Sequence, residues 1–145
     1  MTFFTKDKRE YSIKKEIISV DNKFCYESIK AFDKNNTEIA MLNYKINEEK
    51  SSAWLYYIGI EDESYLRQGI GHNMIILFED ELKSKGIKVV EGRFYPKGAG
   101  AKFAHDFYIS HNYYIEKYDN CDIEIFKQLK LEKSKIKKSQ VSNFL

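Results

Sequence analysis

The sequence predicts a mixed α/β domain with a central, partly parallel sheet flanked by helices. Three observations support this fold class. The first part of the chain reads as four successive strands, an amphipathic helix follows, and the remainder alternates between strand, helix and a final antiparallel pair. We therefore expect the order β-β-β-β-α-β-α-β-β. The chain has 145 residues, of which 43% are hydrophobic, so it can form one domain with its own core.

The four expected strands are rich in β-branched or aromatic residues, and they cover residues 11–20, 24–33, 38–46 and 53–61. Asn35 and Asn36 favour a hairpin turn between the second and third runs, because asparagine tolerates a left-handed backbone. The fourth run is almost wholly apolar or aromatic, which favours a strand at the centre of the sheet that is covered on both faces. Its Trp54, Tyr56 and Tyr57 are expected to fill those faces.

The pattern then changes to a helical period. One apolar helix face is formed by Ile70, Met74, Leu77, Phe78 and Leu82. A glycine at position 86 follows two lysines, which is a typical signal for the C-terminal end of a helix. The chain is therefore expected to be helical from position 70 to shortly before position 86.

A strand over residues 87–95 is expected next, and a second helical face follows it. That face consists of Ala101, Ala104, Phe107, Tyr108 and His111. Asn112 suits a left-handed helix cap, and residues 113–118 and 122–129 read as a closing antiparallel pair. We expect a single domain over residues 1–129 and a lysine-rich C-terminal tail over residues 130–145.

Composition excludes several classes of protein. The net charge of +2 is lower than that of a dedicated nucleic-acid binder, so nucleic acid is not an expected partner. No apolar run approaches about 18 residues, and charged residues interrupt the N-terminal stretch before a signal-peptide core, so we expect a cytoplasmic protein without a membrane partner. The two cysteines show no metal-ligand spacing. Edge strands and the apolar residues of the tail are compatible with a homodimer.

Residues 65–72, with the sequence YLRQGIGH, are the strongest candidate for a binding site. Glycines let the backbone bend and approach a ligand closely, and the first N–H groups of a helix have no intrahelical partners. With the helix dipole and the charge of Arg67, these groups favour a phosphate. The pattern is neither a P-loop nor the dinucleotide fingerprint, since Met74 stands where the third glycine belongs. An ordinary tight turn between a strand and a helix is the alternative interpretation.

The chain resembles the GCN5-related N-acetyltransferases, the GNAT superfamily, in the order of its elements and in two motifs. The acetyl-CoA motif of that family, R/Q-x-x-G-x-G/A, is similar to residues 66–71, with Leu66 at the first position. The family's helix-terminal motif, A-x-x-F/L-Y-x-x-x-G-F, is similar to residues 104–113, with Asn112 in place of the glycine. The resemblance covers residues 53–129.

The resemblance implies direct transfer of an acetyl group from acetyl-CoA to a primary amine on a small molecule or a peptide. It implies that the cofactor lies in a V-shaped gap between two parallel strands, where the backbone of Ile58, Gly59 and Ile60 pairs with the pantetheine arm. It also implies that the loop binds the pyrophosphate, through Arg67, Gln68, Gly69, Ile70, Gly71 and His72.

Two chemical roles are expected at this site. In the family, the tyrosine of the helix-terminal motif protonates the departing CoA thiolate, and the resemblance gives this role to Tyr108. The amine must be neutral to attack, so a general base or a water chain is needed. Glu61 at the end of the apolar strand is the preferred base, and Glu91 on the neighbouring strand and His105 on the later helix are the alternatives.

The first half of the chain departs from the family, because the two helices that usually follow its first strand are hard to find. We therefore expect the N-terminal helices to be reduced. Ala101 stands where the family often has an asparagine. A non-catalytic GNAT-like module that binds CoA or a protein partner is the alternative function. The lysine-rich tail suggests a third hypothesis, an enzyme that acts on RNA-linked or ribosomal amines.

Overall fold

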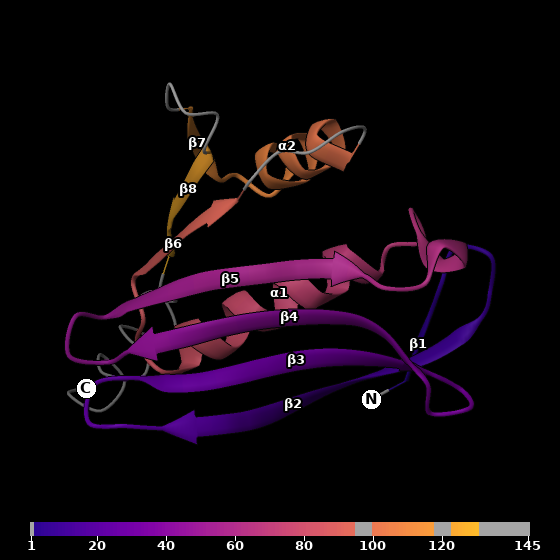
Figure 1. Ribbon diagram of the computed structural model, residues 1–145, viewed down its shortest axis with the longest axis horizontal. Helices are drawn as coiled ribbons and strands as arrows, with labels where there is room; N and C mark the ends of the chain where they lie inside the picture. The colour runs from indigo at the N-terminus through magenta and orange to yellow at the C-terminus, as the bar shows by residue number, and fades with distance from the viewer. Residues whose placement is uncertain (1, 95–99, 118–122, 131–145) are drawn as a thin grey trace, which may run out of the picture.

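The computed structural model describes residues 2–94, 100–117 and 123–130. In these ranges, eight strands form one sheet in the order β1-β2-β3-β4-β5-β6-β8-β7 (Figure 1). The pair β5–β6 is parallel, and the other neighbouring pairs are antiparallel. This arrangement confirms the expected mixed α/β class with a partly parallel sheet.

The first part of the chain is an antiparallel meander of β1 (Thr2–Phe4), β2 (Glu10–Val20), β3 (Cys25–Asp33), β4 (Glu38–Asn47) and β5 (Ser52–Ile60). Asn36 in the turn between β3 and β4 has a φ of 64°, as the two asparagines predict. A short 3-10 helix, η1 (Glu63–Tyr65), follows β5. The sequence does not predict β1 or η1, because three residues are too few to show a period.

The second part contains α1 (Ile70–Ser84), β6 (Val89–Phe94), α2 (Gly100–Ser110), β7 (Tyr114–Lys117) and β8 (Ile123–Gln128). Both predicted helix ends are right, since Gly86 and Asn112 have φ values of 74° and 66°. Within the described ranges, neither helix has the length and apolar character that crossing a membrane requires. Of the predicted tail, only Lys130 lies among the described residues.

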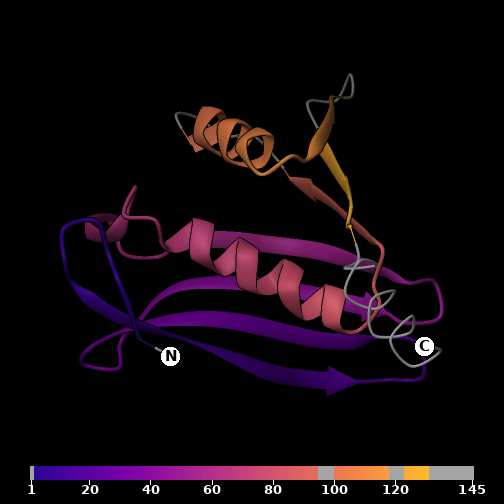
Figure 2. The ribbon, with the colours of Figure 1, turned by 180° about the vertical axis from the view of Figure 1, so that it is seen from behind.

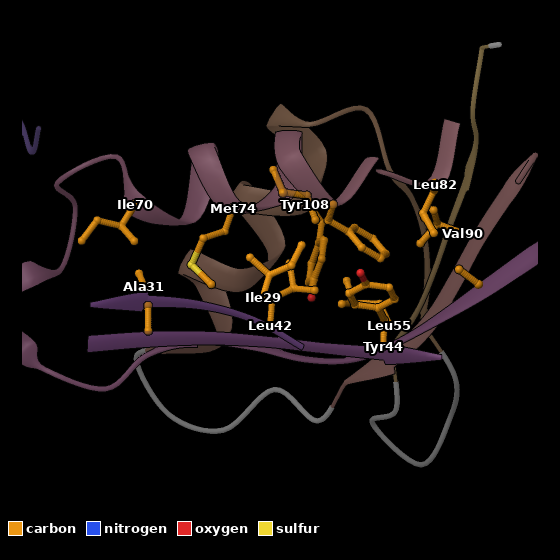
Figure 3. Close-up of a cluster of buried hydrophobic side chains, with 14 of the residues drawn as sticks. Ile29, Ala31, Leu42, Tyr44, Leu55, Ile70, Met74, Leu82, Val90 and Tyr108 are labelled. Carbon is orange, nitrogen blue, oxygen red and sulfur yellow. The ribbon is translucent and has the colours of Figure 1, made fainter. Parts of the chain in front are cut away.

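Helix α1 packs across β3, β4 and β5 on one face of the sheet (Figure 2). Alternate residues of these strands are buried against it, and Tyr108 of α2 joins the same core. The side chains labelled in Figure 3 come from the sheet and from both helices: Ile29, Ala31, Leu42, Tyr44, Leu55, Ile70, Met74, Leu82, Val90 and Tyr108. The core therefore lies between the two helices and one face of the sheet.

The opposite face, which we call the helix-free face, is not covered by either helix of the described part of the chain (Figure 1). Residues 2–62 form strands and turns without a helix, which confirms the expected reduction of the N-terminal helices. The central position of β5 between β4 and β6 is also as predicted. The expectation that β5 is covered on both faces is wrong, because Tyr56 and Tyr57 are each 46% exposed.

A buried carboxylate fixes α1 to the sheet. Glu27 of β3 is 1% exposed, accepts a hydrogen bond from the Tyr44 hydroxyl, and lies 2.8 Å from the Nζ atom of Lys85, just after α1. Burial by itself would raise the pKa of Glu27, but the hydrogen bonds from Lys85 and Tyr44 and the charge of Lys85 outweigh it, so the pKa is lowered. The charged form is therefore the one that the fold stabilises.

A second buried carboxylate connects α1 to the last two strands. Glu79 of α1 is 3% exposed. Its Oε1 atom lies 2.7 Å from Nζ of Lys127 on β8, and its Oε2 atom accepts a hydrogen bond of 3.0 Å from the Tyr113 hydroxyl. These contacts hold β8 and the start of β7 against α1.

We predict that Glu27→Gln lowers the free energy of unfolding by about 2 kcal/mol, because it removes the charge partner of Lys85 from a buried site. Glu81→Gln is the matched control, since Glu81 also contacts Lys85 but is partly exposed, and it should cost less than about 1 kcal/mol. Folding lowers the pKa of Glu27, so its contribution is present above the ordinary carboxyl pKa and is lost as the pH falls through the lowered value.

Urea unfolding of both variants and the wild-type protein, at neutral pH and at acidic pH, measures this effect. The gap between wild type and Glu27→Gln should narrow in acid. A gap that is constant with pH would contradict the assigned charge state.

Candidate active site

The two parallel strands separate part-way along their length. Strands β5 and β6 are paired from Ser52 and Val89 to Leu55 and Gly92, and the described residues that follow, 56–60 on β5 and 93–94 on β6, are not paired with each other. Strand β6 pairs with β8 along its whole length instead, and Figure 1 shows β6, β8 and β7 leading away from β5. Among the described residues, the backbone of residues 56–60 therefore has no strand partner on the side facing β6. Ile58, Gly59 and Ile60 lie on this unpaired stretch.

Gly92 lies at the point where the strands separate. A Cβ atom at Gly92 would lie 2.8 Å from the carbonyl oxygen of Leu55 and 3.1 Å from the side chain of Ile125. The glycine therefore permits the close approach of β6 to both neighbours at the last paired position. Any larger residue would push β6 away from β5 there.

The loop before α1 has the geometry of an open helix N-terminus. Arg67 and Gly69 have left-handed backbones, with φ values of 60° and 89°. No side chain among the described residues caps the helix, whose first internal bond runs from the Asn73 N–H to the Gly69 carbonyl. The N–H groups that precede Asn73 therefore point out of the helix end, and the side of Gly69 that would carry a Cβ is open space.

The loop residues differ in what they face. Gln68 anchors the N-terminal segment: its carbonyl accepts from the Lys6 N–H at 3.3 Å, and its Oε1 accepts from the Asp7 N–H at 3.0 Å. Gly71 faces α2, because a Cβ there would lie 3.3 Å from the Phe107 ring. The side chains of Arg67 and His72 are exposed. The contact with residues 6 and 7 has no signal in the sequence, because it joins segments far apart in the chain.

Tyr108 of α2 is part of the hydrophobic core. It is 5% exposed, and its ring packs against those of Phe94, Phe107 and Tyr113. Burial raises the pKa of the Tyr108 hydroxyl. The described residues offer this hydroxyl no hydrogen-bond partner. The group is therefore a protonated, buried donor.

A histidine pair joins the two helices. The Nδ1 atom of His72, in the first turn of α1, lies 2.8 Å from the Nε2 atom of His111, which directly follows α2. The Nδ1 atom of His111 lies 2.8 Å from the Phe107 carbonyl, which can only accept, so this nitrogen carries a proton. When both rings are neutral, His72 must then donate to His111. Sequence reasoning missed this pair.

The three candidate bases are not brought together. Glu61 follows β5, while Glu91 is exposed on β6 opposite Trp54, about 20 Å away along the strand direction. His105 lies on α2, with its Nδ1 atom 3.5 Å from Asp106. A hydrogen bond to the nearby Glu38 carboxyl, together with burial and the Glu38 charge, raises the pKa of Glu61. Of the three, only Glu61 adjoins the unpaired part of β5.

Several solved acetyltransferases have the same fold as this chain. The PaiA N-acetyltransferase from Thermoplasma acidophilum, in complex with coenzyme A, is 21% identical, with a TM-score of 0.60 over 73% of this chain and 61% of that one. The ribosomal-protein-S18-alanine N-acetyltransferase from Escherichia coli is 12% identical, with a TM-score of 0.61 over 81% and 94%. An acetyltransferase of the GNAT family from Staphylococcus aureus is 14% identical, with a TM-score of 0.61 over 72% and 68%.

The chain has the GNAT fold. No protein-family model matches the sequence, and a search of curated proteins finds no match. The present chain spans about three fifths of the length of the Thermoplasma protein and nearly all of the Escherichia coli one. The two strands that separate, β5 and β6, are joined in the sequence by the loop and by α1, so the open end of α1 directly follows β5.

We predict that Gly92→Ala lowers the free energy of unfolding by about 1–3 kcal/mol, because the added methyl group overlaps the Leu55 carbonyl oxygen. Gly69→Ala is the control for backbone strain alone, since its methyl group meets open space and its cost should be about 1–2 kcal/mol. Hydrogen exchange separates the two. Gly92→Ala should speed amide exchange along β5 and β6, whereas Gly69→Ala should leave those strands protected. Equal protection in both variants would contradict the role given to Gly92.

Proposed function

We propose that this protein is an N-acetyltransferase that moves an acetyl group from acetyl-CoA to a primary amine. One observation carries the proposal: an unpaired stretch of β5 borders a gap between parallel strands, and the helix that follows β5 begins with an uncapped N-terminus. Acetyl-CoA has an extended arm with amide groups followed by phosphates. Its amides match the unpaired stretch of β5, and its phosphates match the helix N-terminus that follows. The crystallisation of coenzyme A with the Thermoplasma protein, which has the same fold, is consistent with it.

The backbone would hold most of the cofactor. Ile58 and Ile60 direct their N–H and C=O groups away from β4, so these groups can pair with the amides of the pantetheine arm, as an added strand would, while Gly59 between them pairs with Met41 of β4. The N–H groups of Ile70, Gly71 and His72 at the start of α1 can donate to the pyrophosphate. Arg67 adds a positive charge, and we assign Gln68 to positioning the loop through Lys6 and Asp7.

Acetyl-CoA would supply an acetyl group activated as a thioester. A free N–H group of β5 can then donate to the acetyl oxygen as negative charge develops on it. The buried hydroxyl of Tyr108 stays protonated because its pKa is raised, so it can give its proton to the departing sulfur. Glu61 accepts a proton from the acceptor amine. The pKa of Glu61 is raised above that of an ordinary glutamate, which makes its carboxylate a stronger base and favours this role.

We predict that the wild-type protein binds acetyl-CoA at least about tenfold more tightly than acetyl-pantetheine, which lacks the phosphates, because charged hydrogen bonds at the α1 end are lost. Gly69→Val should remove this difference by straining the left-handed turn, and it should leave the weak binding of acetyl-pantetheine unchanged. Isothermal titration measures both affinities, and a thermal scan confirms that the variant is folded. Equal affinity of the wild-type protein for the two compounds would contradict the phosphate site.

Turnover separates the enzyme from the non-catalytic alternative. Acetyl-CoA is mixed with a panel of primary amines, and release of the free CoA thiol is followed by a thiol reagent. Amine-dependent release would support the proposed reaction. Tight binding without release for any amine would instead favour a module that only binds CoA.

We predict that Tyr108→Phe lowers kcat by roughly 10–100-fold and leaves the affinity for acetyl-CoA within about twofold, because only the proton donor is lost. Tyr114→Phe is the matched control, since Tyr114 is exposed on β7. The raised pKa of Tyr108 means that its protonated form persists above the ordinary tyrosine value, so wild-type kcat should show no loss from this group as the pH rises toward about 10. Normal turnover in Tyr108→Phe would remove the residue from the mechanism.

A further inference from the structure

A β-bulge turns two tyrosines toward solvent beside the proposed site. Asn43 of β4 pairs with Tyr57, and the next residue, Tyr44, pairs with Leu55, so Tyr56 is the extra residue on β5. The alternation of β5 is therefore interrupted just where its pairing with β6 ends. After the bulge, Ile58 and Ile60 pack against the core, and Tyr57 lies on the helix-free face.

The side chain of Tyr57 lies along its own strand over Gly59. A Cβ atom at Gly59 would overlap the Tyr57 hydroxyl oxygen and its neighbouring ring carbon, so only glycine leaves room for the phenol there. The hydroxyl therefore rests against the middle of the unpaired stretch. Tyr57 is 46% exposed, and no described residue provides a hydrogen-bond partner for its hydroxyl. Tyr57 is not part of the hydrophobic core cluster.

We propose that the acceptor amine approaches from the helix-free face and that Tyr57 is the residue that positions it. This inference rests on the proposed function and adds an acceptor side to it. The hydroxyl oxygen of Tyr57 accepts a hydrogen bond from the amine and holds the nitrogen next to the backbone of Gly59, where the thioester is expected.

In the proposed reaction, the two faces of β5 have different roles. Tyr108 lies on the side of the helices, within the core that α1 and α2 share. The acid for the leaving sulfur thus occupies one side, and the acceptor has access from the other. Near the end of β5, Glu61 is hydrogen-bonded to Glu38, and Glu38 lies 3.5 Å from Lys30. Lys45 lies 5.5 Å from the centre of the Tyr56 ring.

Tyr57→Phe tests the proposal, and Tyr56→Phe is its matched control. Both tyrosines are equally exposed and adjacent, but only Tyr57 lies over Gly59. The acceptors are n-butylamine, spermidine and a lysine peptide with a blocked N-terminus, and the one that the wild-type protein acetylates fastest is used for full kinetics. Titration with acetyl-CoA and a thermal scan accompany each variant.

We predict that Tyr57→Phe raises the KM for the amine about five- to tenfold, the loss expected for one hydrogen bond. Its affinity for acetyl-CoA and its thermal midpoint should match those of wild type, and Tyr56→Phe should leave the amine KM unchanged. Equal amine KM values in the two variants would overturn this inference while leaving the acetyltransferase intact. Absence of acetyl transfer by the wild-type protein would overturn the proposed function, and this inference with it.

Discussion

The structure depends on the point at which β5 and β6 stop pairing. A strand that loses its partner exposes a row of N–H and C=O groups, which must find water, another strand or a ligand. In this protein β5 loses β6 as a partner after Leu55, because β6 pairs with β8 over its full length. Gly92 permits a tight contact with Leu55 at the last position where β5 and β6 are paired. The gap that follows is the proposed cofactor site, and the bulge beside it brings Tyr57 to the opposite face.

Separated strands need another element to hold the two parts of the sheet together, and α1 does this through buried carboxylates. Glu79 reaches Lys127 and Tyr113 on the far side of the gap, while Glu27 on β3 meets Lys85 just beyond the end of α1. Each carboxylate is paired and hydrogen-bonded, which compensates its burial. The same helix presents its open N-terminus toward the proposed site. Its contacts with α2, through Gly71 and the histidine pair, fix the distance between the two helices.

Much of the fold could be predicted from local patterns. The strand and helix periods, the turn at Asn36 and the helix ends at Gly86 and Asn112 are all confirmed, because each depends on residues close together in the sequence. The coverage of β5 was predicted wrongly, since an apolar run does not show whether a helix is present to cover it. The roles of Tyr108, Glu61 and the loop residues stay predictions, although the structure shows that Gln68 is occupied with the N-terminal segment and that Gly71 faces Phe107.

The sequence alone was enough to predict the order of the longer elements from β2 to β8, the glycine-rich turn before α1 and the resemblance to the GNAT superfamily, since these follow from period, backbone freedom and motif spacing. The tertiary structure was needed to show where β5 and β6 separate, which carboxylates are buried, and that His72 meets His111. It was also needed to show that Tyr57 lies over Gly59 and that one sheet face is free of helices in the described part of the chain. These features join residues distant in the sequence or depend on strand register, and no local period encodes either.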